Sequence, residues 1–196
     1  MAGSPNVIVM AGPNGAGKST AAPALLRGRL AVPHFVNADE IARGLSAFAP
    51  ETMATAAGRI MLTRLKDLAG GRADFAFETT LASRSFAPWL RSLVADGYEF
   101  HLVFLWLPSP DLAVARVADR VLQGGHHVPD DVVHRRWAAG LRNFWDLYRP
   151  LAVSWHVYDN SKRSRLRSVA AGAGTVVEFV ERPASWRRFE AQAGGP

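Results

Sequence analysis

The chain has no cysteine among its 196 residues. Disulfide scaffolds, thiolate zinc sites, iron–sulfur clusters and thiol catalysis are therefore excluded together. Long hydrophobic runs are also missing, because the longest, residues 100–108, is too short to span a bilayer and contains His101. The first residues carry no basic region before their apolar stretch, so we predict no secretory signal, no membrane association and a cytoplasmic location.

Lysine is scarce as well. Of the 23 cationic residues only three are lysines, namely Lys18, Lys66 and Lys162, and the rest are arginines. The formal net charge is +6, without any block of like charge. Guanidinium groups suit planar, bidentate contacts with phosphate or carboxylate. The positive net charge and the excess of arginine over lysine fit phosphate-bearing ligands, although an arginine-rich coding bias explains the excess equally well.

The hydrophobic pattern alternates between strands and helices along the whole chain. An apolar share of 48% in 196 residues suits one domain, which we place over residues 1–196. This alternation predicts βαβ units, hence a three-layer α/β sandwich with a mainly parallel sheet of five to six strands. The expected strands are 6–11, 34–38, 73–80, 99–107, 154–158 and 175–179. The expected helices are 18–27, 39–45, 51–69, 83–96, 110–123, 132–148 and a short one near Trp186, within a C-terminal strand and helix over 174–192.

Residues 12–20 read GPNGAGKST and match the Walker A pattern G-x-x-x-x-G-K-[ST] between a strand and a helix. Backbone N–H groups and the helix N-terminus form an anion site, Lys18 reaches the terminal phosphates, and the Ser19 hydroxyl can ligate Mg²⁺. The expected nucleotide-binding residues are Gly12, Pro13, Asn14, Gly15, Ala16, Gly17, Lys18, Ser19 and Thr20. Guanine-reading and ABC-transporter signatures are absent, so the pattern favours a small P-loop kinase that uses ATP and Mg²⁺.

Two carboxylates follow predicted strands. Asp39 comes just after the second strand and Glu78 ends the third, so both are expected at the ligand-binding crevice of a parallel sheet. Asp39 is predicted to act as a catalytic base, and the alternative is an N-cap for the helix that follows. Glu78, with Thr79 and Thr80 beside it, is predicted to contact the acceptor or a metal-bound water.

Arginines bracket a Gly-rich turn that we interpret as a helical lid over about residues 116–136. Arg116 and Arg120 share one helix face, and Arg135 and Arg136 lie beyond the turn. Such cations neutralise a transferring phosphoryl group, whereas the alternative is surface salt bridges with nearby aspartates. His126 and His127 in the turn are interpreted as loop polarity rather than metal ligands.

Three further segments leave alternatives open. Asn160 ends a strand at the same edge, where it either contacts the nucleotide or closes an Asx turn. The aromatic residues Trp137, Phe144, Trp145 and Tyr148 have helical spacing and are interpreted as core. The basic stretch 162–167 is interpreted as a solvated loop or helix start, with nucleic-acid binding as the alternative.

Several segments together resemble the zeta toxin family of P-loop kinases, from about Val7 to Ser161. These segments are AGPNGAGKST, FVNADEIA, FAFETTLASRSF, RVADRVLQGGHHVPDDVVHRRW, LRNFWDLYRPLA and WHVYDNS. The resemblance implies transfer of the γ-phosphoryl group of ATP to a hydroxyl of a nucleotide-sugar, with UDP-N-acetylglucosamine as the family acceptor, and it admits an antitoxin protein as partner. It also implies catalytic roles for Asp39, Lys18 and Arg120. We name Arg136 as the second catalytic arginine of the lid, with Arg135 as the alternative. We also predict that Arg116, Arg120 and Asn160 contact the nucleotide and that the acceptor contacts Asp39, Glu78, Thr79, Thr80 and Arg84.

Two hypotheses follow from these patterns. The first is the small-molecule kinase, with other acceptors such as a nucleoside, NAD or an antibiotic kept as alternatives. The second is a nucleotide-dependent nucleic-acid-binding ATPase that uses Arg163, Arg165 and Arg167. No aromatic side chains interleave with those arginines as a base-stacking platform requires, so the sequence favours the kinase.

Overall fold

The computed structural model describes residues 3–27, 31–125, 127–162 and 165–195. Within them, seven strands form one sheet in the order β2-β3-β1-β4-β5-β6-β7. Their bounds are β1 (Asn6–Ala11), β2 (His34–Val36), β3 (Phe75–Thr79), β4 (Glu99–Trp106), β5 (Ser154–Asp159), β6 (Arg167–Ala173) and β7 (Val176–Val180). Strands β2, β3, β1, β4 and β5 run parallel, while β5-β6 and β6-β7 are antiparallel. This is an α/β fold with a mainly parallel sheet.

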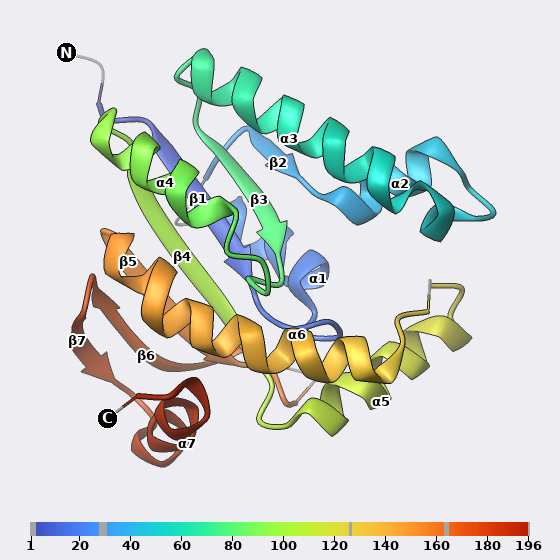
Figure 1. Ribbon diagram of the computed structural model, residues 1–196. Helices are drawn as coiled ribbons and strands as arrows, with labels where there is room; N and C mark the ends of the chain where they lie inside the picture. Colours follow the sequence, from blue (N-terminus) through green and yellow to red (C-terminus); the bar gives the residue numbers. More distant parts are fainter. Residues whose placement is uncertain (1–2, 28–30, 126, 163–164, 196) are drawn as a thin grey trace.

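Helices cover both faces of the sheet, and Figure 1 shows α3, α4 and α6 crossing the face nearest the viewer. The α-helices are α1 (Lys18–Leu26), α2 (Ala38–Leu45), α3 (Ala54–Gly70), α4 (Phe86–Ala95), α5 (Pro110–Leu122), α6 (Asp130–Asn143) and α7 (Pro183–Ala193). Shorter turns are η1 (Pro50–Met53), the π-helical η2 (Phe144–Tyr148) and η3 (Arg149–Leu151). None of the helices in the described ranges is both long enough and apolar enough to cross a membrane.

Alternate residues of the central strands supply two separate hydrophobic cores. Val7 and Val9 of β1 face a core with α3, α4, α6 and α7, whereas Ile8 and Met10 face a second core with α1 and α5. All four side chains are at most 1% exposed. A strand buried on both faces reads as a continuous apolar run, which explains why β1 is recognisable in the sequence.

The expected architecture is confirmed, with one correction to the sheet. The six expected strands are all present, but the sheet has seven strands because β6 was not predicted. The end of the basic stretch 162–167 is also not a helix start: Arg167 is the first residue of β6. Strand β6 reads RSVAAGA, and its small residues carry no β-strand signal. Gly172 is required there, because a Cβ would overlap the carbonyl oxygen of Val176 in β7.

The parallel strands end at one common edge, and this edge positions the site. The register pairs Ala11 with both Thr79 and Phe104, while Trp106 pairs with Asp159. The segments that follow β1, β3 and β5 therefore meet beyond the carboxyl ends of their strands, the usual ligand position in such sheets.

Candidate functional site

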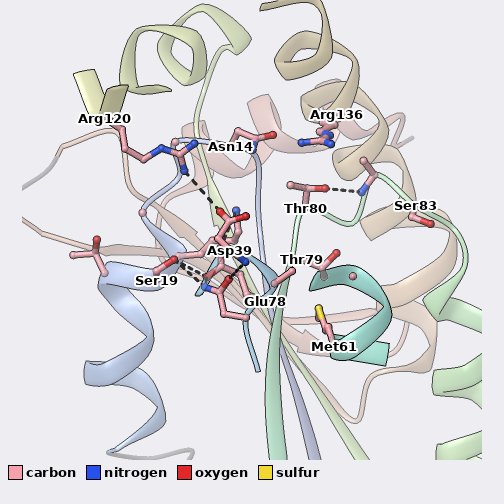
Figure 2. A pocket seen from close by; sticks show the side chains of 18 of the residues that line it. Asn14, Ser19, Asp39, Met61, Glu78, Thr79, Thr80, Ser83, Arg120 and Arg136 are labelled. Carbon is pink, nitrogen blue, oxygen red and sulfur yellow. Dashed lines mark hydrogen bonds and ion pairs between the residues drawn. The ribbon is translucent and has the colours of Figure 1, made fainter. Parts of the chain in front are cut away.

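A cavity of about 770 Å³ opens at the carboxyl edge of the sheet. Its walls come from the loop after β1, the start of α2, the end of β3 with its following loop, and helices α3, α5 and α6. Figure 2 shows Ser19 and Arg120 at one end, Thr79, Thr80, Ser83 and Met61 at the other, and Asp39 with Glu78 between them. The cavity thus has a phosphate-loop end and a hydroxyl-lined end.

Glycines shape the loop after β1. Gly12, Gly15 and Gly17 all have positive φ angles of 139°, 74° and 76°. At Gly12 a Cβ would also overlap the carbonyl oxygen of Leu105 in β4, so no other residue fits without a shift. Gly17 is the N-cap of α1, whose N-terminus therefore points toward the cavity with its free N–H groups. The loop has the geometry of an anion-binding site.

The predicted phosphate-loop residues divide into two groups. Asn14, Gly15, Gly17, Lys18, Ser19 and Thr20 line the cavity, whereas Gly12, Pro13 and Ala16 lie behind it and contribute backbone. The Lys18 Nζ donates to the carbonyl oxygens of Gly12 (2.9 Å) and Pro13 (3.0 Å). Burial lowers the pKa of the Lys18 ammonium, and the nearby Glu78 carboxylate, 3.6 Å away, opposes that shift. This ammonium is thus held inside the loop, beside the phosphate position.

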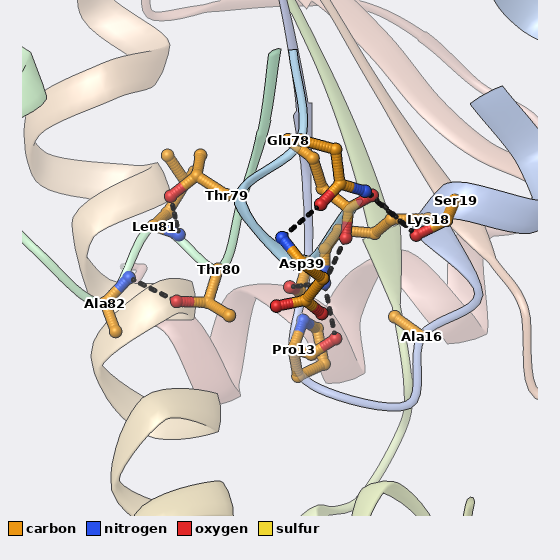
Figure 3. A network of polar contacts seen from close by, with 12 residues as sticks. Pro13, Ala16, Lys18, Ser19, Asp39, Glu78, Thr79, Thr80, Leu81 and Ala82 are labelled. Atoms are coloured by element: carbon orange, nitrogen blue, oxygen red, sulfur yellow. Dashed lines mark hydrogen bonds and ion pairs between the residues drawn. The ribbon is translucent and has the colours of Figure 1, made fainter. Parts of the chain in front are cut away.

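Glu78 is the centre of a polar network that includes a residue the sequence analysis missed. Its Oε2 accepts hydrogen bonds from Ser19 Oγ and from Asn37 Nδ2, both at 2.8 Å (Figure 3 shows the Ser19 contact). Asn37 also donates to Ser19 Oγ at 3.3 Å. The signal for Asn37 was available, because it is the polar residue directly after β2 and a favoured N-cap residue.

The hydroxyl and carboxylate oxygens of Ser19 and Glu78 are the hard ligands that Mg²⁺ prefers. Across the described residues there is no cluster of three or more His, Asp or Glu side chains that would hold a metal unaided. Mg²⁺ is commonly bound by one or two carboxylates together with substrate phosphates, so the pair fits a metal that arrives with a nucleotide. His127 adds no such cluster, and His126 lies outside the described residues.

Asp39 is not the N-cap of α2. The cap is Asn37, whose side-chain oxygen accepts from the Asp39 backbone N–H at 2.8 Å, and this corrects the alternative reading of Asp39. The Asp39 side chain lines the cavity, with 42% of it exposed and its Oδ2 3.9 Å from Arg120 Nη1. Its carboxylate is therefore available to a bound molecule and faces a cation.

Three of the four arginines predicted around the lid face the cavity. Arg116, Arg120 and Arg136 all line the cavity, whereas Arg135 is exposed and does not. Arg116 Nη2 donates to the Ser161 carbonyl oxygen at 2.8 Å, which ties α5 to the segment after β5. Figure 2 places Arg136 across the cavity from Arg120, so cations from two helices face the space between the loops.

Asn160 connects the end of β5 to the phosphate loop. Its Nδ2 donates to the Ala16 carbonyl oxygen at 2.7 Å, and the side chain lines the cavity. The Asx turn expected as its alternative role is made instead by Asp159, whose Oδ1 accepts from the Ser161 N–H at 2.7 Å. Asn160 thus ties the end of β5 to the backbone of the phosphate loop at the cavity.

The loop after β3 carries the hydroxyl-lined end. Thr79, Thr80 and Ser83 line the cavity, but Arg84 is exposed and does not. Sequence reasoning missed Ser83, as well as Asn143 and Tyr148, whose side chains hydrogen-bond to the carbonyl oxygens of this loop. Tyr148 is fully buried, as expected for a core residue, and burial raises the pKa of its hydroxyl to about 12.

Residues 7–147 match a family model described as AAA domain, AAA_33. The chain belongs to this family. A curated relative, an uncharacterized protein of Haemophilus influenzae, is 28% identical over 132 residues, which cover 66% of this chain and 91% of that protein.

Solved structures with a similar fold include the following two complexes. The AvrRxo1-ORF1:AvrRxo1-ORF2 complex matches with a TM-score of 0.73 in its sulphate form and 0.70 in its ATP form, at 15% and 16% identity. Each match covers 95% of this chain, which spans 63% and 64% of the matched chains, just under two thirds of their length. The PezAT toxin–antitoxin structure of Streptococcus pneumoniae matches with a TM-score of 0.64 and 14% identity over 100% of this chain and 80% of that one. At these identities the matches establish the P-loop kinase-like fold.

Proposed function

We propose that this chain is an ATP- and Mg²⁺-dependent kinase of the zeta toxin type. In this proposal it transfers the γ-phosphoryl group to a hydroxyl of a nucleotide-sugar such as UDP-N-acetylglucosamine. The carrying observation is the placement of Asp39 between a phosphate loop and a hydroxyl-lined loop in one cavity, with the Arg120 guanidinium 3.9 Å from its carboxylate. The resemblance of several sequence segments to zeta toxins supports the choice of acceptor.

Each charged group has a task in the proposed reaction. The Asp39 carboxylate accepts the proton of the acceptor hydroxyl while that oxygen forms a bond to the γ-phosphorus. The bond from the γ-phosphorus to the β–γ bridging oxygen breaks, and ADP leaves with that oxygen. Lys18, Arg120 and Arg136 neutralise the negative charge that develops on the transferring group and on the leaving group.

Ser19 and Glu78 are the residues that would hold Mg²⁺, which supplies charge neutralisation on the phosphates when bound. The Ser19–Glu78 hydrogen bond of 2.8 Å keeps their two oxygens adjacent beforehand. Asn37 fixes the Glu78 carboxylate from the other side at 2.8 Å. This preorganisation supports a metal that is bound jointly by protein and nucleotide.

The proposal includes a protein antitoxin as partner, because AvrRxo1-ORF1 is solved together with AvrRxo1-ORF2 and the PezAT structure is of a toxin–antitoxin system. The nucleic-acid alternative has less support. Of its arginines, Arg163 lies outside the described residues, and Arg167 Nη2 pairs with Asp159 Oδ2 at 2.6 Å and with Ser161 Oγ at 3.0 Å. Arg167 therefore serves the β5–β6 junction.

Mass spectrometry of the purified chain with ATP, Mg²⁺ and a panel of acceptors tests the proposal. The panel contains UDP-N-acetylglucosamine, other nucleotide-sugars, nucleosides, NAD and aminoglycosides, and Asp39→Asn is the matched variant. We expect a phosphorylated acceptor with the native chain and a loss of about a hundredfold to ten-thousandfold in its rate with Asp39→Asn. ATP affinity should be unchanged, because Asp39 acts on the acceptor hydroxyl.

The outcomes separate the parts of the proposal. Equal transfer by Asp39→Asn would show that Asp39 is no catalytic base. Phosphorylation of another panel member, but not of UDP-N-acetylglucosamine, would keep the kinase and replace the acceptor. ADP formation without any phosphorylated acceptor would contradict the nucleotide-sugar kinase. It would support the alternative of a nucleotide-dependent nucleic-acid-binding ATPase. Growth arrest upon induction of the native chain, but not of Asp39→Asn, is the result expected of a toxin.

A further inference from the structure

The loop after β3 has an unusual backbone for a segment without glycine. Leu81 has a φ of 56°, in the left-handed region, and its side chain is fully buried. Two threonine hydroxyls hold the local N–H groups: Thr79 Oγ1 accepts from Leu81 N–H at 3.2 Å and Thr80 Oγ1 accepts from Ala82 N–H at 3.4 Å (Figure 3). A strained residue of this kind persists only where its surroundings over-determine it.

The carbonyl groups of the same loop are held from far along the chain. Asn143 Nδ2 donates to the carbonyl oxygens of Leu81 at 2.7 Å and Ala82 at 3.2 Å. The Tyr148 hydroxyl donates to the Ser83 carbonyl oxygen at 2.6 Å. At Gly140, a Cβ would lie 2.5 Å from the Thr80 carbonyl oxygen, so α6 packs directly against the loop backbone there.

These contacts belong to one continuous helical segment, α6 with η2. The same helix carries Arg136 into the cavity, about one turn before Gly140. Next to Arg136, Trp137 Nε1 donates to the Leu107 carbonyl oxygen at 3.0 Å, which fixes the helix to the segment after β4. One helix therefore holds both the cation at the cavity and the backbone of the hydroxyl-lined loop.

We infer that Asn143 is a positioning residue for the acceptor. It sets the place of Thr79, Thr80 and Ser83 relative to Arg136, and so determines which hydroxyl-bearing molecules are held in line with the phosphoryl group. Asn143 is 8% exposed and does not line the cavity, so it acts through the loop and not on the reacting atoms. Its kinetic consequence rests on the proposed kinase function, whereas its effect on the loop does not.

Hydrogen–deuterium exchange on the full chain, without any ligand, tests the loop. Asn143→Asp keeps the side-chain shape but removes both N–H donors, Asn143→Gln keeps the donors, and the exposed neighbour Arg142→Gln is the matched control. We expect exchange of the Leu81 and Ala82 amides to accelerate about tenfold or more in Asn143→Asp, with peptides of β1 and the phosphate loop unchanged. Asn143→Gln should restore part of the protection.

Tyr148→Phe is the second variant if Asn143→Asp does not fold. It removes one hydroxyl, and we expect a smaller, local acceleration confined to residues 82–86. Acceleration spread evenly over the chain in both variants would overturn the inference, because both residues would then be ordinary core residues. Unchanged exchange in the loop would overturn it as well.

Steady-state transfer from ATP to UDP-N-acetylglucosamine tests the positioning role. In Asn143→Asp, kcat/KM for UDP-N-acetylglucosamine should fall about tenfold to a hundredfold, mainly through KM, while KM for ATP stays near its native value. Equal changes in both KM values would overturn the role in acceptor selection. If the native chain does not phosphorylate UDP-N-acetylglucosamine, the proposed acceptor fails, and the exchange experiment still decides whether Asn143 holds the loop.

Discussion

The loops after β1 and β3 border the same cavity but are stabilised in opposite ways. Both follow a buried parallel strand, and both contain residues with positive φ. In the phosphate loop all three of these residues are glycines, and the loop runs directly into its own helix, α1. In the loop after β3 the residue is Leu81, and Asn143, 62 residues further on, hydrogen-bonds to its carbonyl oxygen.

This difference separates a locally encoded loop from a remotely encoded one. Glycine adopts positive φ at no steric cost, so the positive φ angles of the phosphate loop need no distant side chain to offset them, although Asn160 also hydrogen-bonds to the Ala16 carbonyl oxygen of this loop. A leucine in that conformation costs about 1–2 kcal/mol, which distant hydrogen bonds and burial must offset. Variants in each loop and in α6 test whether this distinction holds.

The largest effect is expected at Gly12. Gly12 has a φ of 139°, and any Cβ there would overlap the Leu105 carbonyl oxygen. A substitution would therefore disturb the end of β1 and its neighbour β4 together. We expect Gly12→Ala to lower the free energy of unfolding by about 3 kcal/mol or more, measured by urea denaturation. The matched control is Gly58→Ala in the interior of α3, where a Cβ has nothing within 4 Å.

Gly58→Ala should raise the free energy of unfolding by about 1 kcal/mol, because alanine has the higher helix propensity. A lower free energy of unfolding in both variants would mean that replacing any glycine destabilises the chain, whether or not it lies close to β4. The difference between the two substitutions therefore measures how much the phosphate loop depends on the glycine at position 12.

A smaller effect is expected at Gly140. A Cβ there lies 2.5 Å from a backbone oxygen of the loop after β3, so α6 or the loop must shift. We expect Gly140→Ala to cost about 1–3 kcal/mol, with the exposed α6 variant Ala138→Ser nearly neutral. If Gly140→Ala were neutral, the loop would be tolerant of movement by α6 and the contrast between the loops would fail.

The smallest effect is expected for Tyr148→Phe. It removes the hydrogen bond to the Ser83 carbonyl oxygen, which should cost about 1 kcal/mol at neutral pH. Burial raises the pKa of this hydroxyl to about 12. Since the folded chain keeps this proton to a higher pH than the unfolded chain, stability should fall as pH rises from about 10 toward 12.

Chemical denaturation between pH 8 and 12 measures this dependence, and Tyr148→Phe should have a shallower alkaline decline than the native chain. A parallel decline in both chains would assign the alkaline sensitivity to other groups. Absorbance titration of the tyrosines should lose a component near pH 12 in the variant, as a second measurement of the same proton.

Most of the fold followed from local pattern. Strands β1, β3 and β4 are buried on both faces, so their apolar runs are conspicuous, and the antiparallel β7 was also anticipated within one residue. Strand β6 escaped because its small residues gain their conformation only by pairing between β5 and β7. Apart from Val169, no residue of RSVAAGA favours a strand over a loop.

The residues of the site also divide into those that a local sequence pattern predicts and those that depend on distant contacts. Lys18, Ser19, Asp39 and Glu78 were expected at the crevice from their position after strands, and the structure gathers them around one cavity. Asn143 was not anticipated, because its partners at Leu81 and Ala82 are more than 60 residues away and no periodicity links them. The choice of Arg136 over Arg135 likewise depends on helix rotation, which the sequence left open.

The direct packing of α6 against the loop after β3 also limits how relatives of this chain can diverge. A helix advances about 1.5 Å per residue, so the contacts at Gly140, Asn143 and Tyr148 fit a loop of one length. An insertion between residues 80 and 83 would break every pairing beyond it. A substitution at Ser83 would leave the backbone contacts with α6 and η2 in place, and one at Thr79 or Thr80 would remove only the hydroxyl bond to the Leu81 or Ala82 N–H. New acceptor preferences in such proteins should therefore arise by exchange of side chains at constant loop length.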